Sequence, residues 1–154
     1  MSTMIDKKDD AFLETNIKGM MMTLIARWNE DMDRARRGTE FAEIRPSDMR
    51  VFGQLRGRTV KLSDIHREMG FSRQAAQQAV ERLVAHDMIT VTPAPESNRD
   101  KIVAITAKGQ RWRTIAAGQI RSIEARCAEV AGEAGKEELR RLLISLLKGT
   151  ASDR

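Results

Sequence analysis

The fold of this 154-residue chain is decided by residues 60–109, which are VKLSDIHREMGFSRQAAQQAVERLVAHDMITVTPAPESNRDKIVAITAKG. The first part of this stretch predicts a helix over residues 62–69, with Ser63 or a neighbouring residue as its cap. The helix is expected to end at Gly70, because glycine tolerates the left-handed conformation of a tight turn.

A second helix is predicted over residues 73–86, with the hydroxyl of Ser72 accepting from an amide one turn further on. Two short helices joined by a glycine-containing turn are typical of a helix-turn-helix. At ~100° per residue, the apolar face of the second helix is formed by Ala76, Ala79, Val80 and Leu83. Its polar face is formed by Arg73, Gln74, Gln77, Gln78 and Arg82.

The residue types of this polar face suit a DNA reader. In the major groove, Gln pairs with adenine and Arg with guanine, and each bidentate pair is worth ~1–3 kcal/mol of discrimination. The alternative interpretation is a solvated helix face whose glutamines are merely helix formers.

A two-stranded hairpin is predicted next, and it favours the DNA reader. Residues 89–92 alternate apolar and polar, residues 93–98 are rich in turn formers, and residues 102–105 are apolar enough for a returning strand. Arg99 and Lys101 lie at or beside the tip, where a loop reaches phosphates or a minor groove that the helix does not touch. We expect Thr106 to cap a further helix.

These features resemble the winged helix-turn-helix of the multiple antibiotic resistance regulator (MarR) family, over most of the chain. The most specific match is IleThrAlaLysGly at residues 105–109, which is similar to the family's Leu-Thr-x-x-Gly after an Asp-x-Arg wing. Arg99 falls at the wing arginine, but Ser97 replaces the usual aspartate, and the sequence leaves open whether this weakens the wing contact. Asp87 stands where the family commonly has Gly, so we expect the second helix to end without a left-handed glycine cap.

The flanking segments carry three apolar stripes at helical spacing, one within residues 10–37 and two within residues 107–148, separated by Gly132 and Gly135. A winged unit of about fifty residues cannot cover three stripes, so we expect them to pack on one another, partly across a two-fold axis. The predicted fold is mainly α with a small β-wing, in a single MarR-like domain over 1–154. The terminal segments 10–37 and 107–148 are then dimerisation helices, and 45–106 is the winged helix-turn-helix region.

Charge is concentrated in the winged segment. Residues 50–112 hold 11 Lys/Arg against 6 Asp/Glu, while the whole chain has a net charge of +5. A basic centre between nearly neutral flanks is the electrostatic pattern expected of a face that binds nucleic acid.

The resemblance implies a homodimer whose two recognition helices meet successive major grooves, ~34–36 Å apart, on a pseudo-palindromic operator. We therefore predict a sequence-specific transcriptional regulator of double-stranded DNA, acting as a repressor. The predicted DNA-binding residues are Ser72, Arg73, Gln74, Gln77, Gln78, Arg82, Arg99 and Lys101.

The resemblance also implies a small-molecule pocket for a phenolic or aromatic effector, beside a helix predicted over residues 45–55 and entered at Pro46 or Ser47. Large apolar residues at helical spacing are more often core than pocket lining, which is the alternative interpretation. The candidates by position are Met21, Trp28, Phe41 and Phe52.

We predict no catalysis, no cofactor and no metal site. The chain lacks a glycine-rich phosphate loop, any tyrosine and any His/Cys cluster with ligand spacing. Cys127 lies in an apolar stripe and is interpreted as a buried packing thiol. The charged first residues and the absence of a long apolar run predict a cytoplasmic protein without a membrane segment.

Two alternatives remain open from the sequence. A winged-helix protein-interaction module would use the same basic face on an acidic partner, without reading DNA. A replication or partition factor would bind DNA at a different kind of location.

Overall fold

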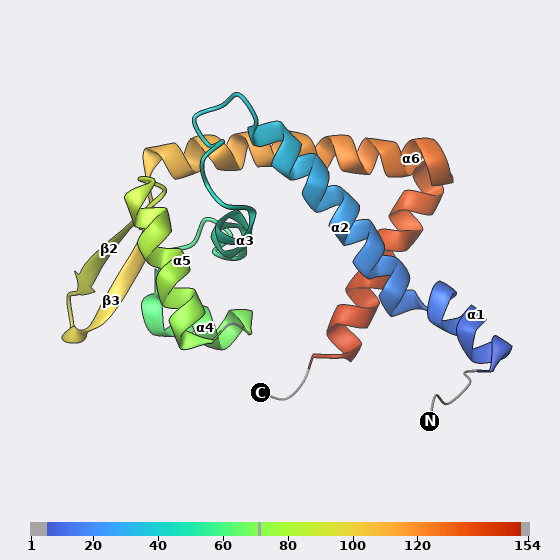
Figure 1. Cartoon of the computed structure of the whole chain (residues 1–154), viewed down its shortest axis with the longest axis horizontal. Coiled ribbons are helices and arrows are strands. Elements are labelled where there is room, and N and C mark those ends of the chain that lie inside the picture. The colour runs from blue at the N-terminus through green and yellow to red at the C-terminus, as the bar shows by residue number, and fades with distance from the viewer. Residues whose placement is uncertain (1–5, 71, 152–154) are drawn as a thin grey trace. The chain divides into compact units, whose positions relative to one another are not determined.

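A computed structural model describes residues 6–70 and 72–151, and the chain divides into two compact units, Met1–Arg113 and Thr114–Arg154 (Figure 1). The predicted class, mainly α with a small β-wing, is confirmed. The elements are α1 (Lys7–Thr15), α2 (Ile17–Arg36), α3 (Pro46–Gln54), β1 (Val60–Lys61), α4 (Leu62–Met69), α5 (Arg73–Ala85), β2 (Ile89–Ala94), β3 (Ser97–Ile105) and α6 (Ala107–Gly149).

The helix predicted over residues 10–37 is broken in two at Asn16. The backbone of Asn16 is extended, and this residue caps both the end of α1 and the start of α2. Its Oδ1 accepts from the amide of Gly19 at 2.8 Å, and its Nδ2 donates to the carbonyl of Leu13 at 2.8 Å. Because a short amide side chain satisfies orphan groups on either side, the break between α1 and α2 is a stable feature.

The helix-turn-helix matches the prediction closely. Helix α4 has the predicted bounds, and Gly70 follows in the left-handed conformation with φ 70°. The hydroxyl of Ser72 accepts from the amide of Ala75 at 3.1 Å, which confirms it as the cap of α5. The predicted cap of α4 was wrong: the residue before α4 is Lys61, which is still in strand β1, so Ser63 lies inside the first turn.

Strand β1 was not predicted, because two residues are too short for a periodic pattern. Val60 pairs with Val103 and Lys61 with Ile102, both antiparallel. This pairing makes β3 the central strand of a three-stranded sheet in the order β1-β3-β2, and it fastens the start of α4 to the hairpin.

The hairpin is longer than predicted. Strand β2 continues through Pro93, which pairs with Lys101, so that the turn contains only Pro95 and Glu96. Proline is tolerated here because β2 is an edge strand, which pairs with a neighbour on one side only. The backbone N–H that proline lacks is therefore not needed for pairing with a second strand. The register shifts between Pro93 and Ala94.

Asp87 lies at the end of α5. Its φ is 59°, so the helix ends without a glycine, as predicted, and the aspartate itself adopts the left-handed conformation. Asp is among the few side chains that tolerate this region. The amide of Met88 donates back to the carbonyl of Leu83 at 2.9 Å, which closes the end of the helix.

The start of α6 is bound to the end of α5. Thr106 is the predicted cap: its hydroxyl accepts from the amide of Gly109 at 3.1 Å and donates to the carbonyl of Asp87 at 2.5 Å. Gly109 is buried, and a Cβ there would lie 2.5 Å from the carbonyl oxygen of Met88. The glycine of the motif at 105–109 therefore permits close approach of two backbones.

The buried apolar residues lie between residues 41 and 112, where α3, α4, α5, the sheet and the start of α6 surround one core. In Figure 1 the hairpin lies beside α5, in agreement with their packing contacts. The largest apolar side chains that are fully buried are Phe41, Phe52, Ile44, Leu55, Ile65, Leu83, Met88, Ile89 and Val103.

The second unit is the remainder of α6, and it is kinked at Gly132. This residue has φ 80° and ψ 160°, outside the helical region. Figure 1 shows that α6 changes direction within its length. The ion pair between Glu124 and Arg140, 2.7 Å long, links the two halves across the kink. The predicted separation of two stripes at Gly132 is confirmed. Among the described helices, none has both the length and the apolar content to cross a membrane.

Candidate nucleic-acid interface

Helix α5 has two distinct faces. Its buried residues are Ala76, Ala79, Val80 and Leu83, as the periodicity predicted. Four of the five residues of the predicted polar face are exposed, and these are Arg73, Gln74, Gln77 and Gln78. The helix is thus held by one face, while the opposite face presents amide and guanidinium groups to the surroundings.

These exposed groups are at the N-terminal half of the helix. Ser72 is also exposed, and its cap bond leaves the hydroxyl hydrogen able to donate to another acceptor. The side chain of Gln77 donates to Glu81 at 3.4 Å, a long bond within the helix. The start of a helix with free amides suits phosphate oxygens, and the glutamines suit base edges.

The hairpin presents two further cations. Arg99 and Lys101 are both exposed residues of β3, two positions apart on the same strand. Since side chains alternate along a strand, both project from the same face of the hairpin. The side chain of Ser97, which the resemblance places at the position of a wing aspartate, lies outside the described part of the structure.

Arg82 differs from the rest of the predicted set, because its guanidinium is committed to a partner. Its Nε and Nη2 donate to the two carboxylate oxygens of Asp48 on α3, at 2.8 and 2.9 Å. The hydrogen bond to Asp48 holds the pKa of this guanidinium above its usual value. Sequence reasoning placed Arg82 on the DNA-facing arc and missed Asp48, for which spacing gave no signal.

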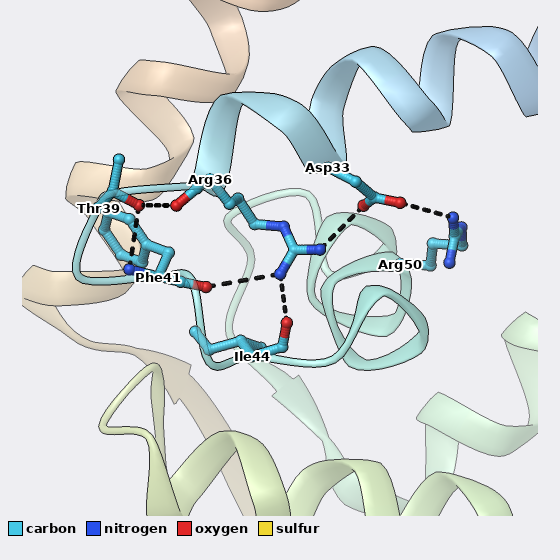
Figure 2. Close-up of polar contacts among 6 residues, drawn as sticks. All are labelled: Asp33, Arg36, Thr39, Phe41, Ile44 and Arg50. Carbon is cyan, nitrogen blue, oxygen red and sulfur yellow. Dashed lines mark hydrogen bonds and ion pairs between the residues drawn. The ribbon is translucent and has the colours of Figure 1, made fainter.

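A second polar cluster joins α2 to α3 (Figure 2). Arg36 is buried and donates to the carbonyl oxygens of Phe41 and Ile44 and, at 3.0 Å, to Asp33. The other oxygen of Asp33 pairs with Arg50 of α3 at 3.5 Å. These contacts hold the loop between α2 and α3, and they too were absent from the prediction.

The four candidates for an effector pocket are not placed alike. Phe41 and Phe52 are each 2% exposed and belong to the core. The ring of Phe41 packs on Trp112, with 5.4 Å between ring centroids. Met21 is exposed and Trp28 half-buried on α2. Burial gives both phenylalanines a packing role, so pocket lining stays a prediction from the resemblance.

Cys127, predicted as a buried packing thiol, is half-buried in the second unit. The part of the chain that the structure describes contains no group of three or more His, Cys, Asp or Glu residues arranged to hold a metal ion.

No family model and no curated protein matches this chain. Solved structures do match. Apo wild-type MarR from E. coli is 12% identical with a TM-score of 0.69, covering 86% of this chain and 97% of that chain. RV1404 from Mycobacterium tuberculosis is 21% identical with a TM-score of 0.68, covering 99% and 100%. The transcriptional regulator Tm0710 from Thermotoga maritima is 16% identical with a TM-score of 0.63, covering 89% and 97%.

The fold is therefore that of a winged helix-turn-helix protein. More specifically, it is the fold of MarR, as the pattern of residues 60–109 predicted. The solved structures that share this fold include proteins described as transcriptional regulators.

Proposed function

We propose that this chain is a homodimeric, sequence-specific regulator of transcription that binds double-stranded DNA, with repression as its mode of action in the cytoplasm. The observation that carries the proposal is the exposed face of α5, where Arg73, Gln74, Gln77 and Gln78 stand opposite a fully buried face. Such a helix enters a major groove without giving up its own packing.

Three further properties support this function. The winged segment holds the excess positive charge of the chain. Arg99 and Lys101 are exposed on the hairpin, where they would contact phosphates or a minor groove. Large apolar side chains are exposed on the terminal helices, as a two-fold interface requires.

The test begins with recovery of genomic DNA bound by the purified protein. The best fragment and a scrambled fragment are then titrated by fluorescence anisotropy across a salt series. A regulator is expected to prefer its operator by ~10³-fold or more. Equal binding to both fragments, driven only by salt, would favour the protein-interaction module instead.

Two variants locate the interface. Gln77→Ala should reduce the preference for operator over scrambled DNA, because it removes a base contact. Lys101→Ala should weaken binding to both fragments alike and reduce the salt slope by ~1, because it removes a phosphate contact. The matched controls, Gln54→Ala on α3 and Lys18→Ala on α2, are exposed and should change neither quantity. Unchanged binding in both test variants would show that the assigned face is wrong.

A further inference from the structure

Of the ion pairs described in the first unit, the pair between Asp48 and Arg82 has the most deeply buried carboxylate. The side chain of Asp48 is 1% exposed and that of Arg82 33%. The pair of Arg111 and Glu40 is also short, at 2.8 Å, but its two side chains are 58% and 47% exposed. A buried carboxylate is costly unless its charge and both its oxygens are satisfied, and Arg82 does both.

The pair also differs in geometry from the apolar contacts around it. Helices α3 and α5 pack together, and two of the four buried residues of α5 are alanines, Ala76 and Ala79. Small side chains interlock little, so apolar packing alone leaves α5 some freedom to slide or roll on α3. A two-point bond between a guanidinium and a carboxylate has a fixed plane and direction, which removes that freedom.

The pair lies near the C-terminal end of α5, so a small change of the helix angle at the pair displaces the exposed residues at the other end. Arg82 lies nine residues from Arg73 and five from Gln77, which correspond to ~13 Å and ~7 Å along the helix axis. A tilt of about 10° around Arg82 would move Arg73 by ~2 Å, which is enough to break a hydrogen bond of 2.7–3.2 Å. Small errors in the α3–α5 angle therefore become large errors at the base edges.

We infer that Asp48 and Arg82 form a positioning pair that sets the angle at which α5 presents its reading face, and that Arg82 does not itself bind phosphate. This inference rests on the proposed function, since it concerns how that same face reads DNA. In this inference Arg82 is a positioning residue and not a DNA contact. Asp48 is a second positioning residue, and it does not contact DNA.

Opposite charge changes separate this role from a phosphate contact. Asp48→Asn makes the protein more positive by one charge, whereas Arg82→Gln makes it less positive by one. If Arg82 binds phosphate, Arg82→Gln weakens all DNA binding and lowers the salt slope by ~1, while Asp48→Asn frees the arginine and strengthens binding. If the pair positions α5, both variants lose operator affinity in the same direction.

The experiment titrates operator and scrambled DNA with the full-length wild-type protein and with Asp48→Asn, Arg82→Gln and Arg82→Lys. The controls are Glu40→Gln and Arg111→Gln, which break the exposed pair with the same two charge changes. We expect each variant of the buried pair to lower the ratio of operator to scrambled affinity by about tenfold or more. The affinity for scrambled DNA should stay within about twofold of the wild-type value, as in the controls. The salt slope should stay within ~0.3 of the wild-type slope.

Arg82→Lys keeps the positive charge but loses the two-point bond. Circular dichroism would show whether Asp48→Asn folds. If it does not, Arg82→Lys still tests whether the two-point bond positions α5. A Lys variant with the wild-type affinity ratio would overturn the inference, as would a fall of the salt slope in Arg82→Gln. A wild-type protein without any sequence preference would overturn the proposed function itself. That result is read from the wild type alone, before any variant is compared.

Discussion

The winged segment and the terminal helices differ in how completely one chain buries its apolar side chains. In the described part of the chain, every buried apolar residue lies between residues 41 and 112. Apart from Val84, the large exposed apolar residues lie on α1, α2 and the second unit, and they include Phe12, Leu13, Ile17, Met20, Met22, Leu24, Ile25, Ile120, Val130, Leu139, Leu142, Ile144, Leu146 and Leu147.

The difference indicates that the two regions are stabilised by different partners. The winged segment obtains its core from its own chain, so its structure is complete in one copy. The terminal helices carry apolar stripes whose exposure in a single copy is costly, at ~25 cal/mol per Å² of apolar surface. A second copy of the chain that covers these stripes would remove that cost, which is the physical basis of the proposed dimer.

The largest effect is expected from a charge on the terminal stripe. Leu142 is 46% exposed on the α6 leucine stripe, and Leu142→Glu would place a carboxylate in the proposed interface. The variant should be monomeric by light scattering and should lose at least tenfold in operator affinity. Lys148→Glu is the control, because residue 148 lies ~180° from the stripe on the same helix. A Leu142→Glu dimer would place the interface elsewhere.

The core of the winged segment should be sensitive at Leu83, which is 0% exposed. Leu83→Ala should lower the free energy of unfolding by ~2–5 kcal/mol, because it removes packed methyl groups and leaves a cavity. Guanidinium chloride unfolding at one fixed protein concentration measures this. The neighbouring residue Val84 is 42% exposed, and Val84→Ala should cost under ~0.5 kcal/mol. Equal losses would mean that the core assignment is mistaken.

A smaller effect is expected where α6 meets the end of α5. The added methyl group of Gly109→Ala would lie 2.5 Å from the carbonyl oxygen of Met88 and 2.7 Å from Cγ2 of Ile105. The resulting backbone shift should cost ~1–3 kcal/mol of unfolding free energy. Gly53 has nothing within 4 Å of the same position, so Gly53→Ala should gain up to ~1 kcal/mol in the same assay. A neutral Gly109→Ala would contradict the close approach.

The smallest effect should come from the exposed ion pairs of the second unit. Hydrogen bonds from Arg140 and Arg141 hold the pKa of Glu137 and Glu138 below the usual value of 4.5. A lowered folded pKa stabilises the folded state above pH 4.5, and this contribution is lost as the pH falls through the lower folded pKa.

The double variant Glu137→Gln with Glu138→Gln should therefore melt slightly below the wild type at pH 7. The difference should shrink as the pH falls below 4.5 and through the lower folded pKa of each carboxylate, where the wild type becomes protonated. Thermal melts from pH 7 to about pH 2 measure it, with Glu129→Gln as a control that removes one exposed charge. A difference that stays constant with pH would assign the effect to packing or helix propensity instead.

Most of the fold followed from local signals. The bounds of α4, the caps Ser72 and Thr106, the turn at Gly70 and the break at Gly132 each depend on residues a few positions apart. Periodicity alone assigned the buried and exposed faces of α5, because one face of a helix must pack.

The errors occurred where a distant or unusual partner decided the outcome. Strand β1 exists only because β3 pairs with it, and the residue before α4 belongs to this strand, so Ser63 lies inside the first turn and does not cap the helix. Asn16 broke the first long helix by capping both sides.

The sequence by itself determined the class of fold, the order of its elements and which face of α5 is polar, because these depend on spacing and residue type. Only the tertiary structure decided which polar residues remain exposed on that face. Arg82 and Asp48 are 34 residues apart, and nothing in local spacing distinguishes a supporting arginine from a reading one. Burial of Asp48 made the distinction, since a buried carboxylate requires a charged partner and Arg82 is the one that reaches it.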